Sequence, residues 1–241
     1  MKKIAFIPAR YAATRFPGKL MHKIGDKTII SMVYSNAMEM NLFDDVVVVT
    51  DSDIILDEIK NIGGRVIKSK NEHQSGSDRI AESCLELDVD IVVNIQGDEP
   101  FIKREPLKSL ISCFEDPLVR VASLMQPFPE NESPDNPNLV KVVCNKMNDA
   151  LYFSRSVIPY RRNKQVEEKI FKHIGVYAYR KDTLLNFTKW PMGNLERLEL
   201  LEQLRYLENG VSIRMVETNE SSVGIDTPED LDKAIAFYKK N

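Results

Sequence analysis

Short apolar runs alternate with segments of helical period through the first part of the chain, and this alternation constrains the fold most. Ile4–Pro8, Val46–Thr50 and Ile91–Ile95 are bounded runs that are too short for helices, so they predict strands buried in a sheet. Thr28–Met40 and Ser52–Ile62 lie between them and carry apolar residues at helical spacing. The same periods predict a further strand and a further helix at 65–68 and 78–87. Strands that alternate with helices predict right-handed βαβ units and an α/β fold with a mostly parallel sheet.

The pattern changes after about Val121, where prolines crowd a loop and strand-like segments follow. These segments are Leu139–Cys144, Ala150–Phe153 and Ile174–Tyr179. We therefore expect one domain over residues 1–241, with an inserted region of mixed or antiparallel strands at about 125–190. Its apolar residues suggest a surface that a monomer would not leave open; they are Val142, Val143, Leu151, Tyr152 and Phe153.

The chain then returns to a helix at 195–208, a strand at 211–216 and a last helix. Glutamates alternate with leucines along the helix at 195–208, which predicts that most of these glutamates form a solvated face. The last helix has a strong start signal, with Thr227 as N-cap and Pro228 at the first helical position.

Composition excludes several classes of protein. The net charge of −3 argues against a general nucleic-acid binder, and no apolar run approaches the length of a membrane span. Cys84, Cys113 and Cys144 are scattered without a C-x-x-C pair, so neither a zinc site nor a disulfide framework is indicated. We expect a reduced, cytoplasmic protein.

A basic loop follows the first predicted strand and contains Arg10, Arg15 and Lys19. Loops at the carboxyl ends of strands are where open α/β sheets bind ligands, and three cations there suit a polyanion. The spacing is neither that of a Walker P-loop nor G-x-G-x-x-G. A solvated basic loop is the alternative reading.

Two aspartates could hold a metal ion. Asp98 follows a buried strand beside Gly97, and Asp226 immediately precedes the last helix. Mg²⁺ takes one or two protein carboxylates together with phosphate and water oxygens. An ordinary turn at Asp98 and an ordinary helix start at Asp226 explain the same residues.

Other polar residues are open to two readings. The segment from His73 to Arg79 suits a ribose, a base edge or an anion at a helix N-terminus, but a simple capped turn explains it equally well. His173 and Arg155 are each flanked by strand-like residues, and a lone histidine in such a place is more often structural than catalytic.

Eight segments lie in order along almost the full length: IPARYAATRFPGK, HQSGSDRI, VNIQGDEP, NPNLVKVV, ALYFSRSVIPY, KHIGVYAYR, LEQLR and GIDTPEDL. Together they resemble the 3-deoxy-manno-octulosonate cytidylyltransferases, or CMP-Kdo synthetases. The resemblance implies a Rossmann-like nucleotidyltransferase sheet with a smaller dimerisation region, and with the apolar residues of the inserted region it leads us to expect a homodimer formed through residues 125–190. It also implies transfer of CMP from CTP to the anomeric hydroxyl of Kdo, with release of pyrophosphate, in lipopolysaccharide biosynthesis.

The resemblance further implies roles for individual residues. Those expected to bind the nucleotide are Arg10, Arg15, Lys19, Ser75, Gly76 and Arg79. Lys19, Asp98 and Asp226 are expected to be catalytic, with both aspartates as Mg²⁺ ligands. The expected sugar-binding residues are Gln96, Arg155, His173, Tyr177, Glu202 and Gln203, with Arg155 facing the Kdo carboxylate.

Three alternatives stay open. A cytidylyltransferase for another 3-deoxy sugar acid, such as 8-amino-Kdo or sialic acid, is the nearest. A GT-A type glycosyltransferase would require a D-x-D metal motif, which Gly97-Asp98-Glu99 does not supply. A non-catalytic nucleotide sensor would be expected to have lost one of the two aspartates.

Overall fold

The computed structural model describes residues 1–12, 16–71, 73, 75–129, 132–163, 165, 169–220 and 224–240. The chain divides into two compact units. Unit 1 comprises residues 1–104 and 221–241, and unit 2 comprises residues 105–220. The region expected to be an insertion, at about 125–190, lies within unit 2.

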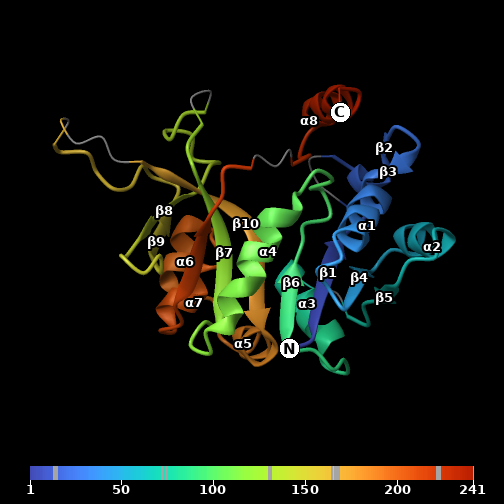
Figure 1. Cartoon of the computed structure of the whole chain (residues 1–241), viewed down its shortest axis with the longest axis horizontal. Helices are drawn as coiled ribbons and strands as arrows, with labels where there is room; N and C mark the ends of the chain where they lie inside the picture. The colour runs from blue at the N-terminus through green and yellow to red at the C-terminus, as the bar shows by residue number, and fades with distance from the viewer. Residues whose placement is uncertain are drawn as a thin grey trace. The chain divides into compact units, whose positions relative to one another are not determined.

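Unit 1 contains a parallel sheet in the strand order β6-β1-β4-β5 (Figure 1). The strands are β1 (Lys3–Ala9), β4 (Asp45–Thr50), β5 (Val66–Lys68) and β6 (Ile91–Asn94). The apolar runs form these strands because their side chains are buried on both faces, as the near-zero exposure of Phe6, Val47 and Val92 shows. The predicted α/β fold class is confirmed.

Helices α1 (Ile29–Glu39), α2 (Asp53–Asn61) and α3 (Gly76–Cys84) pack against this sheet. Thr28 caps α1 by accepting a hydrogen bond from the Ser31 amide. A short 3₁₀ helix, η1 (Lys19–Met21), and the small hairpin of β2 (Lys23–Ile24) and β3 (Lys27–Thr28) follow the loop after β1.

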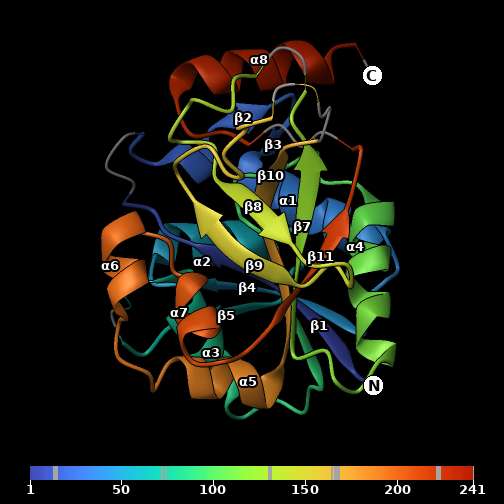
Figure 2. The same cartoon turned by 90° about the vertical axis from the view of Figure 1, so that its left-hand side faces the viewer.

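The last helix, α8 (Pro228–Tyr238), belongs to unit 1 and lies beside β2 in Figures 1 and 2. It begins as predicted, because the Thr227 side chain and Asp230 form a reciprocal capping box and Pro228 occupies the first turn. The ring of Phe237 meets that of Phe101 edge-on at 4.8 Å between centroids. This contact and the cap fix the segment that carries Asp226.

The described residues of unit 2 form five strands of mixed direction, as expected for this region. They are β7 (Val121–Pro127), β8 (Lys141–Cys144), β9 (Ala150–Ser154), β10 (Phe171–Arg180) and β11 (Ile213–Glu217). Strand β10 pairs antiparallel with β7 and β8, β11 pairs parallel with β7, and β8 pairs antiparallel with β9 (Figure 2). Its helices are α4 (Arg104–Ser112), η2 (Cys113–Glu115), α5 (Lys181–Phe187), α6 (Asn194–Glu199) and α7 (Leu204–Glu208).

The prediction of one helix at 195–208 is wrong. The structure has α6 and α7, separated at Leu200, which adopts a left-handed conformation with φ of 52°. The prediction of a solvated glutamate face also fails, because Glu196 is buried and accepts two hydrogen bonds from Arg205 at 2.6 and 2.7 Å. A forked ion pair of this kind compensates the cost of burying both charges.

The apolar residues expected on an open surface of unit 2 are divided between its core and its exterior. Val142 and Phe153 are 1% and 0% exposed, so they do not form part of a surface, whereas Leu151 is 61% exposed. Regular alternation would place Leu151 and Phe153 on the same face of β9, but the pairing of β9 with β8 is irregular between Tyr152 and Ala150, and Leu151 lies in this irregularity. Within the described ranges, the helices are too short or too polar to cross a lipid bilayer.

Candidate active site

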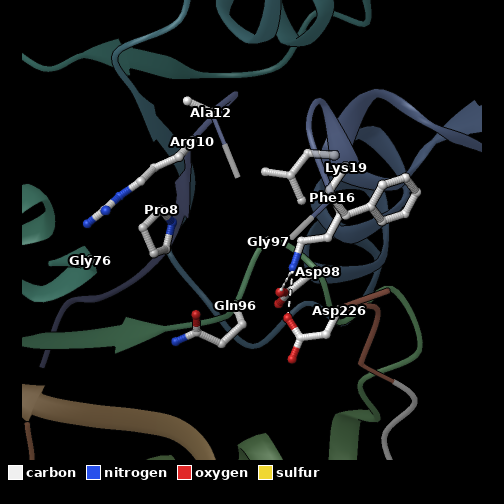
Figure 3. A pocket seen from close by; sticks show the side chains of 11 residues that line it. Pro8, Arg10, Ala12, Phe16, Lys19, Gly76, Gln96, Gly97, Asp98 and Asp226 are labelled. Carbon is white, nitrogen blue, oxygen red and sulfur yellow. Dashed lines mark hydrogen bonds and ion pairs between the residues drawn. The ribbon is translucent and has the colours of Figure 1, made fainter. Parts of the chain in front are cut away.

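A pocket of about 390 Å³ lies in unit 1, where the chain leaves the carboxyl end of β1 (Figure 3). Its walls come from the loop after β1, from η1, from the start of α3, from the turn after β6 and from the residue before the cap of α8. The lining residues are Pro8, Arg10, Ala12, Phe16, Lys19, Leu20, Gly76, Gln96, Gly97, Asp98 and Asp226. The pocket is therefore at the sheet edge that the sequence predicted.

The Lys19 ammonium contacts both candidate metal-binding carboxylates. Its Nζ lies 2.5 Å from Asp98 Oδ2 and 3.2 Å from Asp226 Oδ1 (Figure 3). Only 12% of the Lys19 side chain is exposed, against 27% for Asp98 and 56% for Asp226. The three residues expected to be catalytic thus form one cluster.

The backbone around this cluster is closely constrained. Gly18, at φ of 65°, precedes η1 and donates its amide to the Tyr11 carbonyl at 3.1 Å, which closes the loop before Lys19. A Cβ on Gly97 would lie only 3.1 Å from the Pro8 carbonyl oxygen, so glycine lets this turn approach β1. The Ile225 amide donates to the Asp98 carbonyl at 3.0 Å, which ties the two aspartate segments together.

The remaining cations of the loop differ in position. Arg10 lines the pocket and is exposed, and in Figure 3 its side chain extends away from the Lys19 ammonium, towards Gly76. Arg15 lies outside the described residues. The predicted polyanion site therefore retains two described cations on separate sides of the pocket.

The residues expected to border the nucleotide have different environments. Gly76 lines the pocket, whereas the Ser75 hydroxyl caps α3 by accepting from the Asp78 amide at 3.1 Å. Arg79 is 1% exposed and donates to the Ala9 carbonyl at 2.9 Å and to Asp51 Oδ2 at 2.6 Å. The hydrogen bond from Arg79 is the largest influence that lowers the pKa of Asp51. Arg79 thus holds the end of β1 through its hydrogen bond to the Ala9 carbonyl, and it is not among the residues that line the pocket.

The expected sugar-binding residues are divided between the units. Gln96 belongs to unit 1 and lines the pocket. Its Nε2 donates a hydrogen bond to Asn94 Oδ1 at 3.4 Å. The other five belong to unit 2; they are Arg155, His173, Tyr177, Glu202 and Gln203.

A bulge in β10 brings His173 and Tyr177 together. The pairing of β10 with β7 shifts between Ile174 and Tyr177, and the two rings lie 5.3 Å apart between centroids. Ser123, on β7, contacts His173 Nε2 at 2.9 Å and the carbonyls of Ile174 and Val176 at 3.2 and 2.9 Å. Bulges often redirect side chains next to functional sites, and this one places two polar aromatic side chains in contact.

Burial determines the protonation of these two side chains. It lowers the pKa of His173 to about 3, so the imidazole is neutral at physiological pH. Burial, followed by the charges of Tyr179 and Glu202, raises the pKa of Tyr177 well above its usual value. The Tyr177 hydroxyl therefore keeps its proton, and the Glu202 carboxylate lies close enough to influence it.

Arg155 is held by the backbone of unit 2. Its guanidinium donates to the carbonyls of Glu199, Leu200 and Pro137 at 2.7, 3.3 and 3.0 Å. The Glu199 carboxylate in turn accepts from the Arg155 amide at 2.9 Å and from the Ser154 hydroxyl at 2.6 Å. This network joins the end of α6 to β9, just before the turn that carries Glu202 and Gln203. Gln203 is buried and occupies the N-cap of α7.

Sequence reasoning missed Ser123, Glu199 and Lys141 as parts of these networks. Lys141 is fully buried, and its ammonium donates to the carbonyls of Leu139 at 2.8 Å, Asn136 at 3.2 Å and Arg155. Burial lowers the pKa of Lys141. The sequence offered a signal for two of these residues, because polar groups in buried strands require partners. Lys141 lies in the apolar run of β8, and Ser123 lies in that of β7.

The residues of the pocket fit a magnesium ion. The described part of the chain holds no group of three or more His, Cys, Asp or Glu side chains that could bind a metal by themselves. Mg²⁺ does not require one, since it binds through one or two carboxylates together with substrate phosphates and water. Asp98 and Asp226 already share one cation, the Lys19 ammonium, which shows that both carboxylates can face a single positive charge.

Comparison with known proteins shows the family of this chain. A family model described as cytidylyltransferase matches residues 4–213. The chain is 55% identical over 99% of both lengths to the 3-deoxy-manno-octulosonate cytidylyltransferase of Flavobacterium johnsoniae. It is 53% identical to that of Christiangramia forsetii, over 96% of this chain and 94% of the relative. A solved structure of CMP:2-keto-3-deoxy-manno-octonic acid synthetase complexed with CTP is also similar, with a TM-score of 0.95 and 39% identity over 100% of this chain and 99% of the other. The resemblance read from the eight segments is confirmed, and the chain belongs to the 3-deoxy-manno-octulosonate cytidylyltransferase family.

Proposed function

We propose that this chain transfers the CMP moiety of CTP to the anomeric hydroxyl of Kdo, giving CMP-Kdo and pyrophosphate for lipopolysaccharide biosynthesis. One observation carries the proposal: the Lys19 ammonium contacts Asp98 and Asp226 together in the pocket after β1. A cation beside two carboxylates at the carboxyl edge of a parallel sheet suits a polyanionic nucleotide that arrives with a metal ion. Relatives named for this enzyme, at up to 55% identity, support the choice of nucleotide and sugar.

Positively charged side chains would bind the nucleotide. Arg10 and Lys19 line the pocket and would bind the triphosphate, together with Arg15 by the family resemblance. Arg10 can form forked hydrogen bonds to phosphate, whereas Lys19 acts as a point charge. As the sugar oxygen bonds to the α-phosphorus, the bond to the departing pyrophosphate breaks. These cations would offset the charge that accumulates there.

Asp98 and Asp226 would hold Mg²⁺. Magnesium supplies, when bound there, charge neutralisation on phosphate oxygens and a lowered pKa for the attacking hydroxyl. The backbone hydrogen bond from Ile225 to Asp98 keeps the two carboxylate segments in register. The protein then needs no covalent intermediate, since its residues position and neutralise the reacting groups.

Side chains of unit 2 would recognise the sugar acid. Because His173 is neutral and Tyr177 keeps its proton, both would serve as hydrogen-bonding groups for sugar hydroxyls rather than as charges. Glu202 would accept hydrogen bonds from sugar hydroxyls. Gln203, which is buried at the start of α7, would position the turn that carries both residues. Arg155 would supply the positive charge for the Kdo carboxylate, which would be costly to bury unpaired.

We also propose a cytoplasmic homodimer formed through residues 125–190. Exposed apolar side chains in this region support it, among them Leu151 at 61% and Met147 at 68% exposed. The cysteines Cys84, Cys113 and Cys144 are free, which agrees with a reducing compartment. Sedimentation showing only monomer at micromolar concentration would contradict the dimer.

Pyrophosphate release tests the activity. The purified protein with Mg²⁺ is assayed with each of the four nucleoside triphosphates against Kdo, 8-amino-Kdo and sialic acid. We expect turnover with CTP and Kdo. Turnover with sialic acid but not with Kdo would overturn the choice of sugar. Absence of turnover with every pair, while CTP still binds, would favour a nucleotide sensor.

A further inference from the structure

The Lys19 ammonium occupies the position between two carboxylates that a metal ion is proposed to take. Its Nζ lies within 2.5 Å of Asp98 Oδ2 and 3.2 Å of Asp226 Oδ1. The lysine side chain is 12% exposed and is the least exposed member of this cluster. Partly buried charges interact more strongly than exposed ones, because water and salt screen them less.

The fold holds this contact in place from both sides. Lys19 lies at the start of η1, directly after Gly18 with its left-handed conformation, and the neighbouring Leu20 is buried. On the carboxylate side, the Ile225 amide binds the Asp98 carbonyl. Asp226 directly precedes the capped start of α8. The ion pairs therefore join two segments whose backbones are held by these contacts.

We infer that Lys19, which would bind the triphosphate once nucleotide is present, acts in the absence of nucleotide as a counter-ion for the metal site, so that a divalent cation must displace it. The inference rests on the proposed function, because it takes Asp98 and Asp226 as the metal ligands. Before CTP arrives, the ammonium neutralises part of the carboxylate charge, keeps the two side chains together and competes with the metal. A triphosphate offers the ammonium a new anionic partner, which frees both carboxylates. Metal and nucleotide therefore enter together, and the metal alone binds weakly.

Direct metal binding without nucleotide tests this inference. The probe is Mn²⁺, followed by electron paramagnetic resonance on the full-length protein in the absence of CTP and Kdo. Lys19→Met keeps the length of the side chain and removes its charge. We expect the dissociation constant for Mn²⁺ to fall about tenfold or more in this variant, which corresponds to about 1.4 kcal/mol. Lys19→Gln should give the same direction and serves if the methionine variant does not fold.

Arg10→Met is the matched control. It removes one positive charge from the same pocket, but the Arg10 side chain extends away from the carboxylates (Figure 3). We expect its effect on Mn²⁺ affinity to be about twofold or less, since a distant exposed charge is screened. Equal gains in Arg10→Met and Lys19→Met would show a general field effect and overturn the inference. Unchanged or weaker Mn²⁺ binding in both Lys19 variants would also overturn it.

A double variant separates this inference from the proposed metal site. Adding Asp98→Asn to Lys19→Met should abolish the gained affinity, because one of the two carboxylates is lost. If the gain persists, Mn²⁺ binds elsewhere and the assignment of Asp98 as a metal ligand fails. If the gain disappears, the metal site stands and the effect belongs to the contact between Lys19 and the carboxylates.

Discussion

The Ser123 hydroxyl lies 2.9 Å from His173 Nε2 and joins two strands of unit 2 at the point where their pairing is irregular. The same oxygen contacts the carbonyls of Ile174 and Val176 in the bulge of β10. One small side chain on β7 thus supports the strand distortion and the histidine that the distortion redirects. Because desolvation of this half-buried imidazole lowers its pKa, its protonation is linked to folding.

Stability should therefore depend on pH through His173. Its pKa is about 3 in the folded protein and 6.5 for an unperturbed imidazole, so the unfolded chain binds more protons between these values. The free energy of unfolding should fall as the pH drops below about 6.5, with a slope of up to about 1.4 kcal/mol per pH unit from this group. Urea titrations of wild type and His173→Asn between pH 7 and pH 5 measure it. The free energy of unfolding of His173→Asn should depend less steeply on pH than that of wild type, and equal slopes would contradict the lowered pKa of His173. His22 is exposed, so His22→Asn controls for the loss of an imidazole as such.

Loss of either pocket carboxylate should impair chemistry more than folding. Asp98→Asn or Asp226→Asn is expected to lower kcat by about a hundredfold or more, because a charge clamp on the transition state loses a ligand. Pyrophosphate release at saturating CTP and Kdo measures the effect. Glu99→Gln is the matched control, since Glu99 neighbours Asp98 in sequence but is not one of the lining residues. Unaltered turnover in both aspartate variants would rule the metal assignment out.

Arg155 should discriminate between the two substrates. If it pairs with the Kdo carboxylate, Arg155→Ala should raise the KM for Kdo by roughly thirty- to a hundredfold and change the KM for CTP far less. Arg155→Lys should already impair Kdo binding, because lysine cannot replace a forked set of donors.

The carbonyl contacts of Arg155 require a structural control. The alanine variant also releases the carbonyls of Glu199, Leu200 and Pro137, so we expect a lower melting temperature as well. A changed melting temperature with equal effects on both KM values would reduce Arg155 to a structural role. A rise in the KM for CTP alone would place it at the phosphates.

Arg79 should contribute to stability rather than to nucleotide affinity. Arg79→Met leaves the Ala9 carbonyl and Asp51 without their partner, and we expect a loss of about 2–3 kcal/mol in the free energy of unfolding. The folded fraction should keep a KM for CTP within a few-fold of wild type. Urea unfolding combined with steady-state kinetics separates the two roles. Wild-type stability with a large rise in the KM for CTP would restore the nucleotide contact that the family resemblance implies.

Much of the fold could be predicted because its strongest signals are local. The uninterrupted apolar run of β4 and the Thr227-Pro228 start of α8 each depend on a few neighbouring residues. The meeting of Asp98 with Lys19 was accessible too, because both follow strands whose carboxyl ends share one edge of a parallel sheet. The sequence was therefore informative wherever local pattern and sheet geometry decide the outcome.

The rest depends on partners that lie far apart in the chain. Leucine carries no turn signal, so the left-handed Leu200 and the division into α6 and α7 could not be expected from its identity. The sequence does not distinguish an Arg79 that binds phosphate from one that binds Asp51. The placement of α3 beside β1 decides between the two partners. Tertiary contacts, rather than propensity, determine these features.

The position of Asp226 along the chain has a consequence for synthesis. Asp98 and Lys19 emerge from the ribosome early, whereas Asp226 follows only after all of unit 2 has been translated. A nascent chain therefore lacks one member of the carboxylate pair until Asp226 has been translated, and so does a product terminated within unit 2. Asp226, directly before the capping box of α8, is thus the last of the lining residues to be translated, and an incomplete chain lacks part of the pocket wall.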